Sequence, residues 1–356
     1  MRYRLKRAVT LLGLVSVTGS IWASSHYEIG VDGLCENSDF TDTWSLGTTL
    51  NYYVEGIDAT SVSNRPYSLI PFLDRLGSMG LSHRYVERDT EASSYNSEYL
   101  QATQYGLNGQ YSIKSTNTVL RASYNYLDET VWMGGSGFRL VPDANENNSE
   151  PIDGRWTTEY DLWVYLLGIN SFENPTDPTT VLAPLSFLPI PPIHFETHIF
   201  SVGYGYYIRP MSLLSIDYTY SLQSDEVIEH SNGFRADIER YDTYQIRVSS
   251  FSVIALNEQW ISIEAGIAYD YSFDESEAEY YSLDAKVDYF LQKETSIGVE
   301  GGLRLDEDGS LEEKSIGGGV THYFKDNLSL TARIGYQKEE SEPDSISFQV
   351  GVQIRL

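Results

Sequence analysis

The sequence of 356 residues predicts an all-β protein, an antiparallel up-and-down β-barrel that crosses a membrane. Three observations support this prediction. Many segments alternate apolar and polar residues, short and long connections alternate between them, and no apolar run long enough for a membrane helix follows the N-terminus. Alternation over about ten residues gives a tilted strand one face for lipid and one for a watery interior. A mean hydropathy of -0.31 fits this arrangement, because every second strand residue is polar.

Residues 1–23 have the features of a secretory signal peptide. The positively charged region contains Arg2, Arg4, Lys6 and Arg7. A short apolar stretch follows, and the small residue Ala23 places the expected cleavage between Ala23 and Ser24. We therefore expect one mature domain, 24–356. The single cysteine, Cys35, lies well past the cleavage point, which argues against a lipoprotein and excludes an intrachain disulfide framework.

Alternating segments then follow one another in a regular series. In chain order they are 46–54, 79–85, 104–113, 120–126, 202–208, 214–220, 244–248, 261–269, 281–289, 297–305, 316–324, 328–336 and 346–356. The last segment alternates without a break and resembles the closing strand and assembly signal of a bacterial outer-membrane barrel. Its final residue, Leu356, departs from the usual aromatic residue. One such strand is a weak indication, but a long series is a strong one.

The connections between these segments are of two kinds. The short ones are 114–117, 209–211, 256–258, 292–294 and 325–327, and the long acidic ones are 225–240, 274–279, 306–313 and 339–344. Short periplasmic turns that alternate with longer external loops are typical of outer-membrane barrels. This pattern predicts that both termini are periplasmic and that the carboxylates gather outside the cell.

The strand count depends on the region between 126 and 202. A single crossing at 161–169 would break the alternation of up and down strands, and that segment is apolar on both faces. The stretch 174–192 holds six prolines, which the interior of a sheet rejects. We therefore expect 14 strands and a large external excursion around 128–197. The alternative has 16 strands, with a second crossing in this region.

One turn position carries an unusual segment, Arg65–Leu76. It contains Phe72-Leu73-Asp74-Arg75 and leads into an alternating strand that begins at Met79. Here the chain resembles the general bacterial porin family of Gram-negative outer membranes, in which the first pair of strands is joined by a proline-containing linker of this kind. The resemblance extends over the whole mature chain through short motifs. It implies a barrel and a pore, and it supplies no catalytic residues.

The charge of the chain restricts its partners. The signal peptide holds four of the 24 Lys and Arg residues and none of the 51 Asp and Glu residues, so the mature net charge is 20 − 51 = −31. Phosphate binding needs the opposite sign, which argues against nucleic acid. A strongly negative surface instead favours divalent cations or permeant cations as partners.

Few residue patterns suggest catalysis or metal binding. His194, Glu196 and His198 share one face of a strand, as a metal site requires, but no fourth ligand is near in sequence, and we interpret them as ordinary polar residues. The run 306–309 resembles half of a calcium loop without its downstream part. No serine or aspartate stands in an arguable pairing with histidine. We therefore expect no enzyme activity, no defined metal site and no cofactor.

The inward face of the predicted strands is more informative, because it holds most of the strand charges. The candidate pore-lining residues are Arg84, Arg121, Asp217, Arg247, Glu264, Asp284, Lys286, Asp288, Glu300, Arg304, Arg333 and Arg355. A charge on the lipid face costs roughly 2–4 kcal/mol at the middle of the bilayer, so their confinement to one face supports the barrel. Two interpretations stay open: a field across the lumen that filters solutes, or ion pairs between neighbours that stabilise the wall.

These features predict a porin, a passive outer-membrane channel for small hydrophilic solutes that prefers cations. The alternative is a surface adhesin or structural barrel whose lumen is plugged by the excursion at 128–197. The expected partners are outer-membrane lipids, lipopolysaccharide bound through divalent cations, and the barrel-assembly machinery during biogenesis. The protein is expected to be a monomer or a homotrimer.

Overall fold

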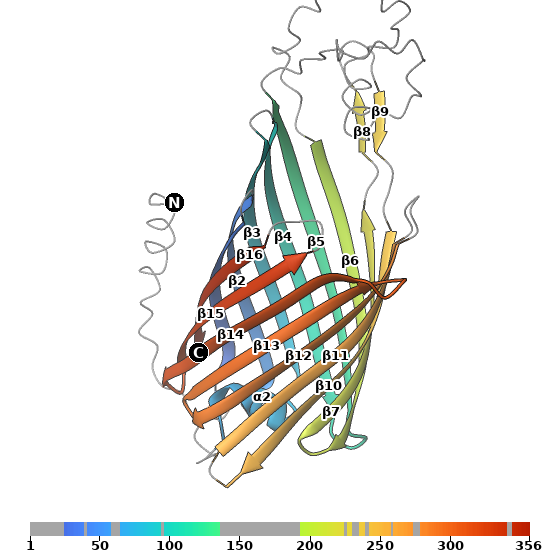
Figure 1. Cartoon of the computed structure of the whole chain (residues 1–356). Helices are drawn as coiled ribbons and strands as arrows, with labels where there is room; N and C mark the ends of the chain where they lie inside the picture. The colour runs from blue at the N-terminus through green and yellow to red at the C-terminus, as the bar shows by residue number, and fades with distance from the viewer. Residues whose placement is uncertain are drawn as a thin grey trace, which may run out of the picture.

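The computed structural model describes residues 25–38, 41–57, 65–93, 96–135, 193–223, 226–229, 235–238, 242–257, 259–272, 278–339 and 344–356. Fourteen antiparallel strands within these ranges form a closed up-and-down barrel (Figure 1). Each strand pairs with its neighbours along the chain, and β1 pairs with β16 to close the sheet. The predicted barrel of 14 strands is confirmed. The predicted signal peptide and its cleavage site at Ala23 and Ser24 lie outside the described residues.

The barrel strands are long enough to cross a membrane at a tilt. They are β1 (Ser25–Asn37), β2 (Thr41–Ile57), β3 (Ser78–Ser93), β4 (Asn96–Ile113), β5 (Thr118–Gly135), β6 (Ile193–Arg209), β7 (Ser212–Gln223), β10 (Asp242–Leu256), β11 (Gln259–Ser272), β12 (Glu279–Gln292), β13 (Thr295–Asp306), β14 (Leu311–Lys325), β15 (Leu328–Glu339) and β16 (Ser345–Arg355). A separate hairpin, β8 (Glu226–Glu229) and β9 (Arg235–Ile238), extends the connection between β7 and β10.

The first strand is absent from the series that the sequence predicts. In β1 the outward positions after Val31 are Gly33 and Cys35, whereas the apolar Leu34 falls on the inward register. This breaks the alternation on which the prediction depends. The strand forms because β2 and β16 both pair with it, so its stability comes from neighbours that are distant in sequence.

The direct pairing of β5 with β6 decides the strand count. Their register runs from Thr118 opposite Tyr206 to Val131 opposite Ile193, so no further strand lies between them in the barrel. Within the range 128–197 that is predicted for the excursion, β5 continues to Gly135 and β6 begins at Ile193. The segment 161–169 and the proline run fall within 136–192, outside the described residues.

The two faces of the wall differ as expected for a barrel in lipid. Large apolar side chains stand outward and exposed, for example Val202 and Ile334, each at 60%. Tyrosines on neighbouring strands extend this outer face as a belt in which Tyr218, Tyr244, Tyr269 and Tyr281 have successive ring centroids 5.4–6.5 Å apart. Tyrosine suits such a belt because its ring prefers apolar surroundings and its hydroxyl prefers water. No helix among the described residues is both long and apolar enough to span a membrane.

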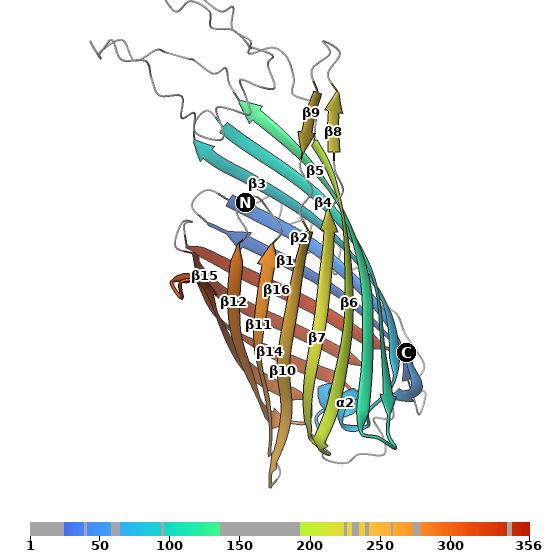
Figure 2. The ribbon, with the colours of Figure 1, turned by 90° about the vertical axis from the view of Figure 1, so that its right-hand side faces the viewer.

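The two ends of the barrel have different connections. At one end, which we call the short-turn end, four of the connections have two residues and one, 114–117, has four. The long connections lie at the opposite, loop end. The connection between β2 and β3 is the exception, because it occupies 58–77 at the short-turn end. Two perpendicular views show its helix α2 (Ile70–Leu73) within the outline of the barrel at that end (Figures 1 and 2).

Candidate channel lumen and its plug

All twelve predicted pore-lining residues lie on the register opposite the exposed apolar face of their strands. Glu264, Asp284, Lys286 and Glu300, for instance, alternate with the outward residues Ile263, Leu283, Val287 and Val299 along β11, β12 and β13. The barrel thus has a charged inner wall. That these residues line a conducting pore stays a prediction.

Several of the charges form ion pairs that run along the wall. Arg84 of β3 donates to Asp32 of β1 at 2.8 Å, and the strand between them presents Gly47 at the crossing point. A Cβ atom at Gly47 would collide with the Asp32 carboxylate and press on the Arg84 guanidinium. The glycine therefore provides the space in which the two side chains meet.

The same arrangement recurs elsewhere in the barrel. Arg121 of β5 reaches Asp217 of β7 at 3.1 Å across Gly203 of β6. A third pair joins Arg247 of β10 to Asp284 of β12 at 2.6 Å, across Gly266 of β11. In each case an inward glycine separates strands that carry opposite charges, so the pair lies flat against the wall instead of projecting across the lumen.

The remaining predicted charges have varied surroundings. Lys286 lies 3.5 Å from Asp288 on its own strand, and the Arg304 guanidinium stacks on the ring of Tyr280 at 3.9 Å from the centroid. Arg333 lies beside Gly319, where a Cβ atom would contact its side chain. Arg355 is buried at the short-turn end and has a different role, described below.

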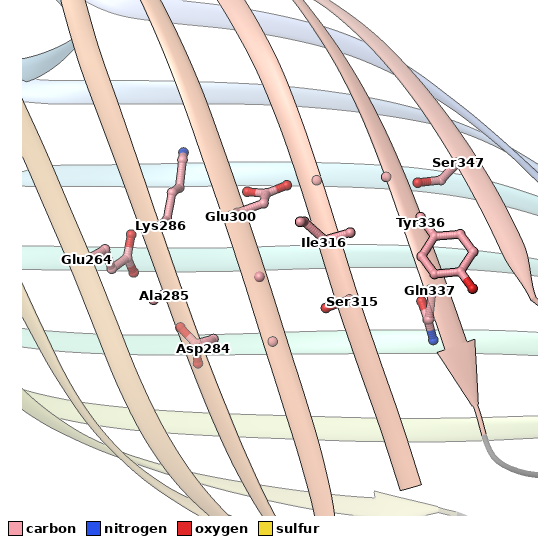
Figure 3. Close-up of a pocket in the computed structure, with 14 residues that line it drawn as sticks. Glu264, Asp284, Ala285, Lys286, Glu300, Ser315, Ile316, Tyr336, Gln337 and Ser347 are labelled. Atoms are coloured by element: carbon pink, nitrogen blue, oxygen red, sulfur yellow. The ribbon is translucent and has the colours of Figure 1, made fainter. Parts of the chain in front are cut away.

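A polar recess of about 400 Å³ opens on the inner wall between β11 and β16. The registers place Lys286 between Glu264 and Glu300, as Figure 3 shows, with Asp284 nearby. Toward β16 the lining changes to uncharged residues, two of which, Ile316 and Tyr336, are large. The others include Gly302, Ser315, Gly317, Gly335, Gln337 and Ser347. The glycines create the hollow because they have no side chains, and the charged residues Glu264, Asp284, Lys286 and Glu300 form one side of it.

The short-turn end of the lumen contains the segment 65–77, which we call the plug. It comprises the 3-10 helix η1 (Tyr67–Leu69) and the α-helix α2. Pro66 precedes η1 and Pro71 occupies the first turn of α2, where its missing N–H has no intrahelical partner to lose. The helix ends at Leu73. Two residues later Arg75, with a φ of 53°, reverses the chain, and the Leu76 amide donates to Pro71 O at 2.9 Å.

Apolar side chains of the plug pack against bulky residues of the inner wall. Ile70 is fully buried, in a cluster with Tyr53 of β2 and Tyr323 of β14. A second cluster joins Leu69 to Val253 of β10 and Phe290 of β12. Because these strands lie on different sides of the barrel, the plug spans the lumen and does not merely coat one wall.

Polar contacts add to this packing on several sides. The Tyr67 amide donates to Lys293 O in the turn between β12 and β13 at 3.1 Å. On β6, the Tyr207 hydroxyl donates to Phe72 O at 3.3 Å. Arg75 donates to Asn117 Oδ1 at 2.6 Å and stacks on the Tyr207 ring at 4.1 Å from the centroid. These contacts fix the plug across the short-turn end of the lumen.

A buried charged cluster connects the plug to the closure of the barrel. Arg355 Nε donates to Glu28 Oε2 at 2.8 Å, and Arg355 Nη1 donates to the Tyr67 carbonyl at 3.0 Å. The Tyr53 hydroxyl donates to the other Glu28 oxygen at 3.1 Å, and Arg355 Nη2 donates to the Tyr323 hydroxyl at 3.4 Å. One guanidinium thus binds the last strand to the first strand and to the plug.

Sequence reasoning missed most of this assembly. It found Arg355 on the inward register but did not identify Glu28 or Asp32, because both belong to the unpredicted strand β1. It noted the segment around Phe72 as unusual without placing it inside the lumen. The available indication was an apolar run, residues 69–73, at a turn position where the other turns are polar.

The other candidate groups have local partners. His194 Nδ1 lies 2.9 Å from the Thr130 hydroxyl and His198 Nδ1 lies 2.9 Å from the Tyr124 hydroxyl. Asp306 accepts hydrogen bonds from the Ser310 amide and hydroxyl at 2.9 and 2.6 Å, so it closes its own turn. Within the described part of the chain, no group of three His, Cys, Asp or Glu side chains is positioned to hold a metal ion.

The fold has counterparts among solved barrels. The CymD monoaromatic hydrocarbon channel (9% identity, 94% of this chain and 89% of that chain) has a TM-score of 0.54. The toluene transporter TodX of P. putida (10% identity, 94% and 91%) has a TM-score of 0.51. The Acinetobacter baumannii outer membrane protein Omp33 (13% identity, 94% and 99%) has a TM-score of 0.49. No protein-family model matches the chain, and no curated protein matches its sequence.

Proposed function

We propose that this protein is an outer-membrane porin, a passive channel for small hydrophilic solutes that prefers cations, and that its short-turn end is closed in the present structure. The main support is the charged inner wall, with its glycine-spaced ion pairs and its polar recess of about 400 Å³. The outer apolar face and its tyrosine belt match a lipid environment.

The lining supports the proposed class of solute. CymD and TodX share the fold and are named for hydrocarbons. Here the recess is lined by Glu264, Lys286 and Glu300, which an apolar solute would have to desolvate without forming new hydrogen bonds. The register shifts found among the described strand pairs also lie near strand ends, so the pairing in the middle of the wall is continuous. A continuous wall keeps a solute inside the lumen and away from the apolar outer face. Both the charged lining and the continuous wall favour hydrophilic solutes.

Cation preference is supported by carboxylates at the loop end. Glu313 and Glu339 face each other in register on the inward side of β14 and β15, and Glu36 of β1 accepts a hydrogen bond from Ser345 at 2.8 Å. In the adjacent connection, a hydrogen bond from the Tyr336 hydroxyl and the nearby Lys338 lower the pKa of Asp344, which keeps that carboxylate ionised at neutral pH. Fixed negative charge at a channel mouth raises the local concentration of cations.

The proposed porin function also gives the protein an orientation in a Gram-negative outer membrane. The short-turn end, with both ends of the barrel chain, faces the periplasm, and the loop end faces outward. The acidic loops then bind divalent cations that bridge to lipopolysaccharide phosphates. The barrel-assembly machinery inserts the chain, and the final assembly is a monomer or a homotrimer.

A second candidate function is a surface adhesin or structural barrel that conducts nothing. The specific observation in its favour is the plug. The sequence predicts an obstruction by the excursion at 128–197, whereas the plug, 65–77, packs across the lumen at the short-turn end. A barrel with a permanently occluded lumen would use its loops alone.

Planar-bilayer recordings separate the two functions. The purified wild-type chain is expected to give stepwise conductance. In a KCl gradient across the bilayer, the reversal potential is expected to have the sign of the K⁺ equilibrium potential. Absence of steps in the wild-type chain at every voltage would establish the non-conducting barrel. A reversal potential of the opposite sign would refute cation preference while leaving the channel intact.

A further inference from the structure

The plug is an addition to a barrel whose hydrogen bonding is complete without it. Every barrel strand pairs with two neighbours, and the β1–β16 seam alone has ten residue pairs. Two backbone hydrogen bonds join the described plug residues to the rest of the chain, from Tyr67 to Lys293 O and from Val54 to Gly77 O. The other contacts between plug and wall are made by side chains. The plug can therefore leave the lumen without opening the sheet.

We propose that the plug is the gate of the channel, that it opens by undocking from the inner wall as a unit, and that Arg355 is the latch residue that holds it closed. This inference rests on the proposed channel function and concerns the regulation of the same lumen. It assigns a role to Arg355 that differs from pore lining.

Arg355 is held in position by contacts with the wall that do not depend on the plug. Arg355 is held by Glu28 and lies over the Tyr323 ring at 5.2 Å from the centroid, and neither contact involves the plug. Its exposed fraction is 4% and that of the Glu28 side chain is 5%. When the plug departs, these wall contacts keep the guanidinium aimed at the site of the Tyr67 carbonyl. Redocking then needs no rearrangement of the wall, which is what a reversible gate requires.

The plug is held on two sides that differ in chemistry. Toward β14 and β16 the contact is the polar latch at Tyr67. Toward β6 and β10 it is aromatic: the Phe72 ring lies 4.5 Å from Phe251 in an edge-on arrangement and 5.5 Å from Tyr207. Ile70 has no solvent exposure and packs with Tyr53 of β2 and Tyr323 of β14. A single substitution at Ile70 or Phe72 weakens one attachment and leaves the strand pairing unchanged.

Cross-linking tests the motion directly. In a Cys35→Ser background, Phe72→Cys and Phe251→Cys place one thiol on the plug and one on the wall. A short reducible bifunctional thiol reagent is expected to lower the conductance at least tenfold, and reduction is expected to restore it. The Phe72→Cys single variant, treated in the same way, is the control and should keep its conductance. Unchanged conductance with complete cross-linking, as measured by mass spectrometry, would overturn the gate.

A loosened plug provides the converse test. Ile70→Ala is expected to raise the fraction of time spent open at least tenfold, because it removes the fully buried contact of the plug with Tyr53 and Tyr323. Ser68→Ala, at an exposed position of the same segment, should leave that fraction unchanged. Equal open fractions for both variants in correctly folded barrels would overturn the proposal. If the wild-type chain and the cross-linked form both conduct, the gate is refuted and the channel stands. If the wild-type chain does not conduct, the channel itself is refuted.

Discussion

Arg355 and Glu28 form an ion pair 2.8 Å long that joins the last strand of the barrel to the first, and both side chains are almost completely buried. A charge removed from water in this way is stable only while its partner and its hydrogen bonds remain. The Tyr53 hydroxyl, the Tyr323 hydroxyl and the Tyr67 carbonyl supply those bonds. One small network thus reinforces the β1–β16 seam and also binds the plug.

This network predicts strong coupling between its two charged members. Arg355→Met alone leaves the Glu28 carboxylate buried without its partner and is expected to destabilise the barrel by about 3–5 kcal/mol. Glu28→Gln together with Arg355→Met removes both charges and is expected to lower the stability of the barrel less than Arg355→Met alone. Urea unfolding of the protein in lipid vesicles, followed by the gel mobility of the folded barrel, measures both. Additive losses in the double variant would show that the pair is not coupled.

The predictable part of this structure is the part that follows from local alternation. Segments such as 297–305 and 328–336 present an apolar outer face, and this alternation is visible in the residues themselves. The plug depends instead on contacts between Ile70 and wall residues such as Tyr53 and Tyr323, which no local pattern reveals. Strand β1 was missed for a related reason, because its pairing partners compensate for a broken alternation.

The glycines opposite the wall ion pairs predict a position-specific effect. Gly47→Ala places a Cβ atom against Asp32 and Arg84, so the 2.8 Å pair must separate. Because the pair is partly exposed, the expected loss of stability is about 0.2–1 kcal/mol. Gly33→Ala is the matched control on the adjacent strand, since its Cβ atom would have only an ordinary contact at 3.8 Å. Alanine is also the better strand residue, so this control should be neutral or slightly stabilising. Equal effects of the two changes in urea unfolding would contradict a structural role for the space at Gly47.

The recess predicts how selectivity depends on individual residues. Glu264→Gln with Glu300→Gln removes two negative charges on either side of Lys286 without changing side-chain size. The reversal potential in a KCl gradient is expected to move toward zero, because the lumen then attracts K⁺ less strongly. Ser347→Ala, at the opposite side of the same recess, is the control and should not move it. An unchanged reversal potential in the double glutamine variant would show that permeant ions do not pass this wall.

The last prediction concerns the junction between the plug and β3. Arg75 adopts a left-handed backbone (φ 53°) that favours glycine, and its side chain bonds to Asn117 and stacks on Tyr207. Arg75→Gly relieves a backbone cost of about 1 kcal/mol. The change also removes a charged hydrogen bond and a cation–π contact, which contribute about 1.5–3 and about 0.5–1 kcal/mol. The net effect is a weaker hold on the plug by about 1–3 kcal/mol.

In a Cys35→Ser, Phe72→Cys background, the position-72 thiol should therefore react faster with a water-soluble maleimide. Lys114→Ala serves as the control, because it removes only an exposed 4.0 Å contact with Glu55 at the same end of the barrel. If Arg75→Gly and Lys114→Ala gave the same labelling rate, the side chain of Arg75 would not be holding the plug in the lumen.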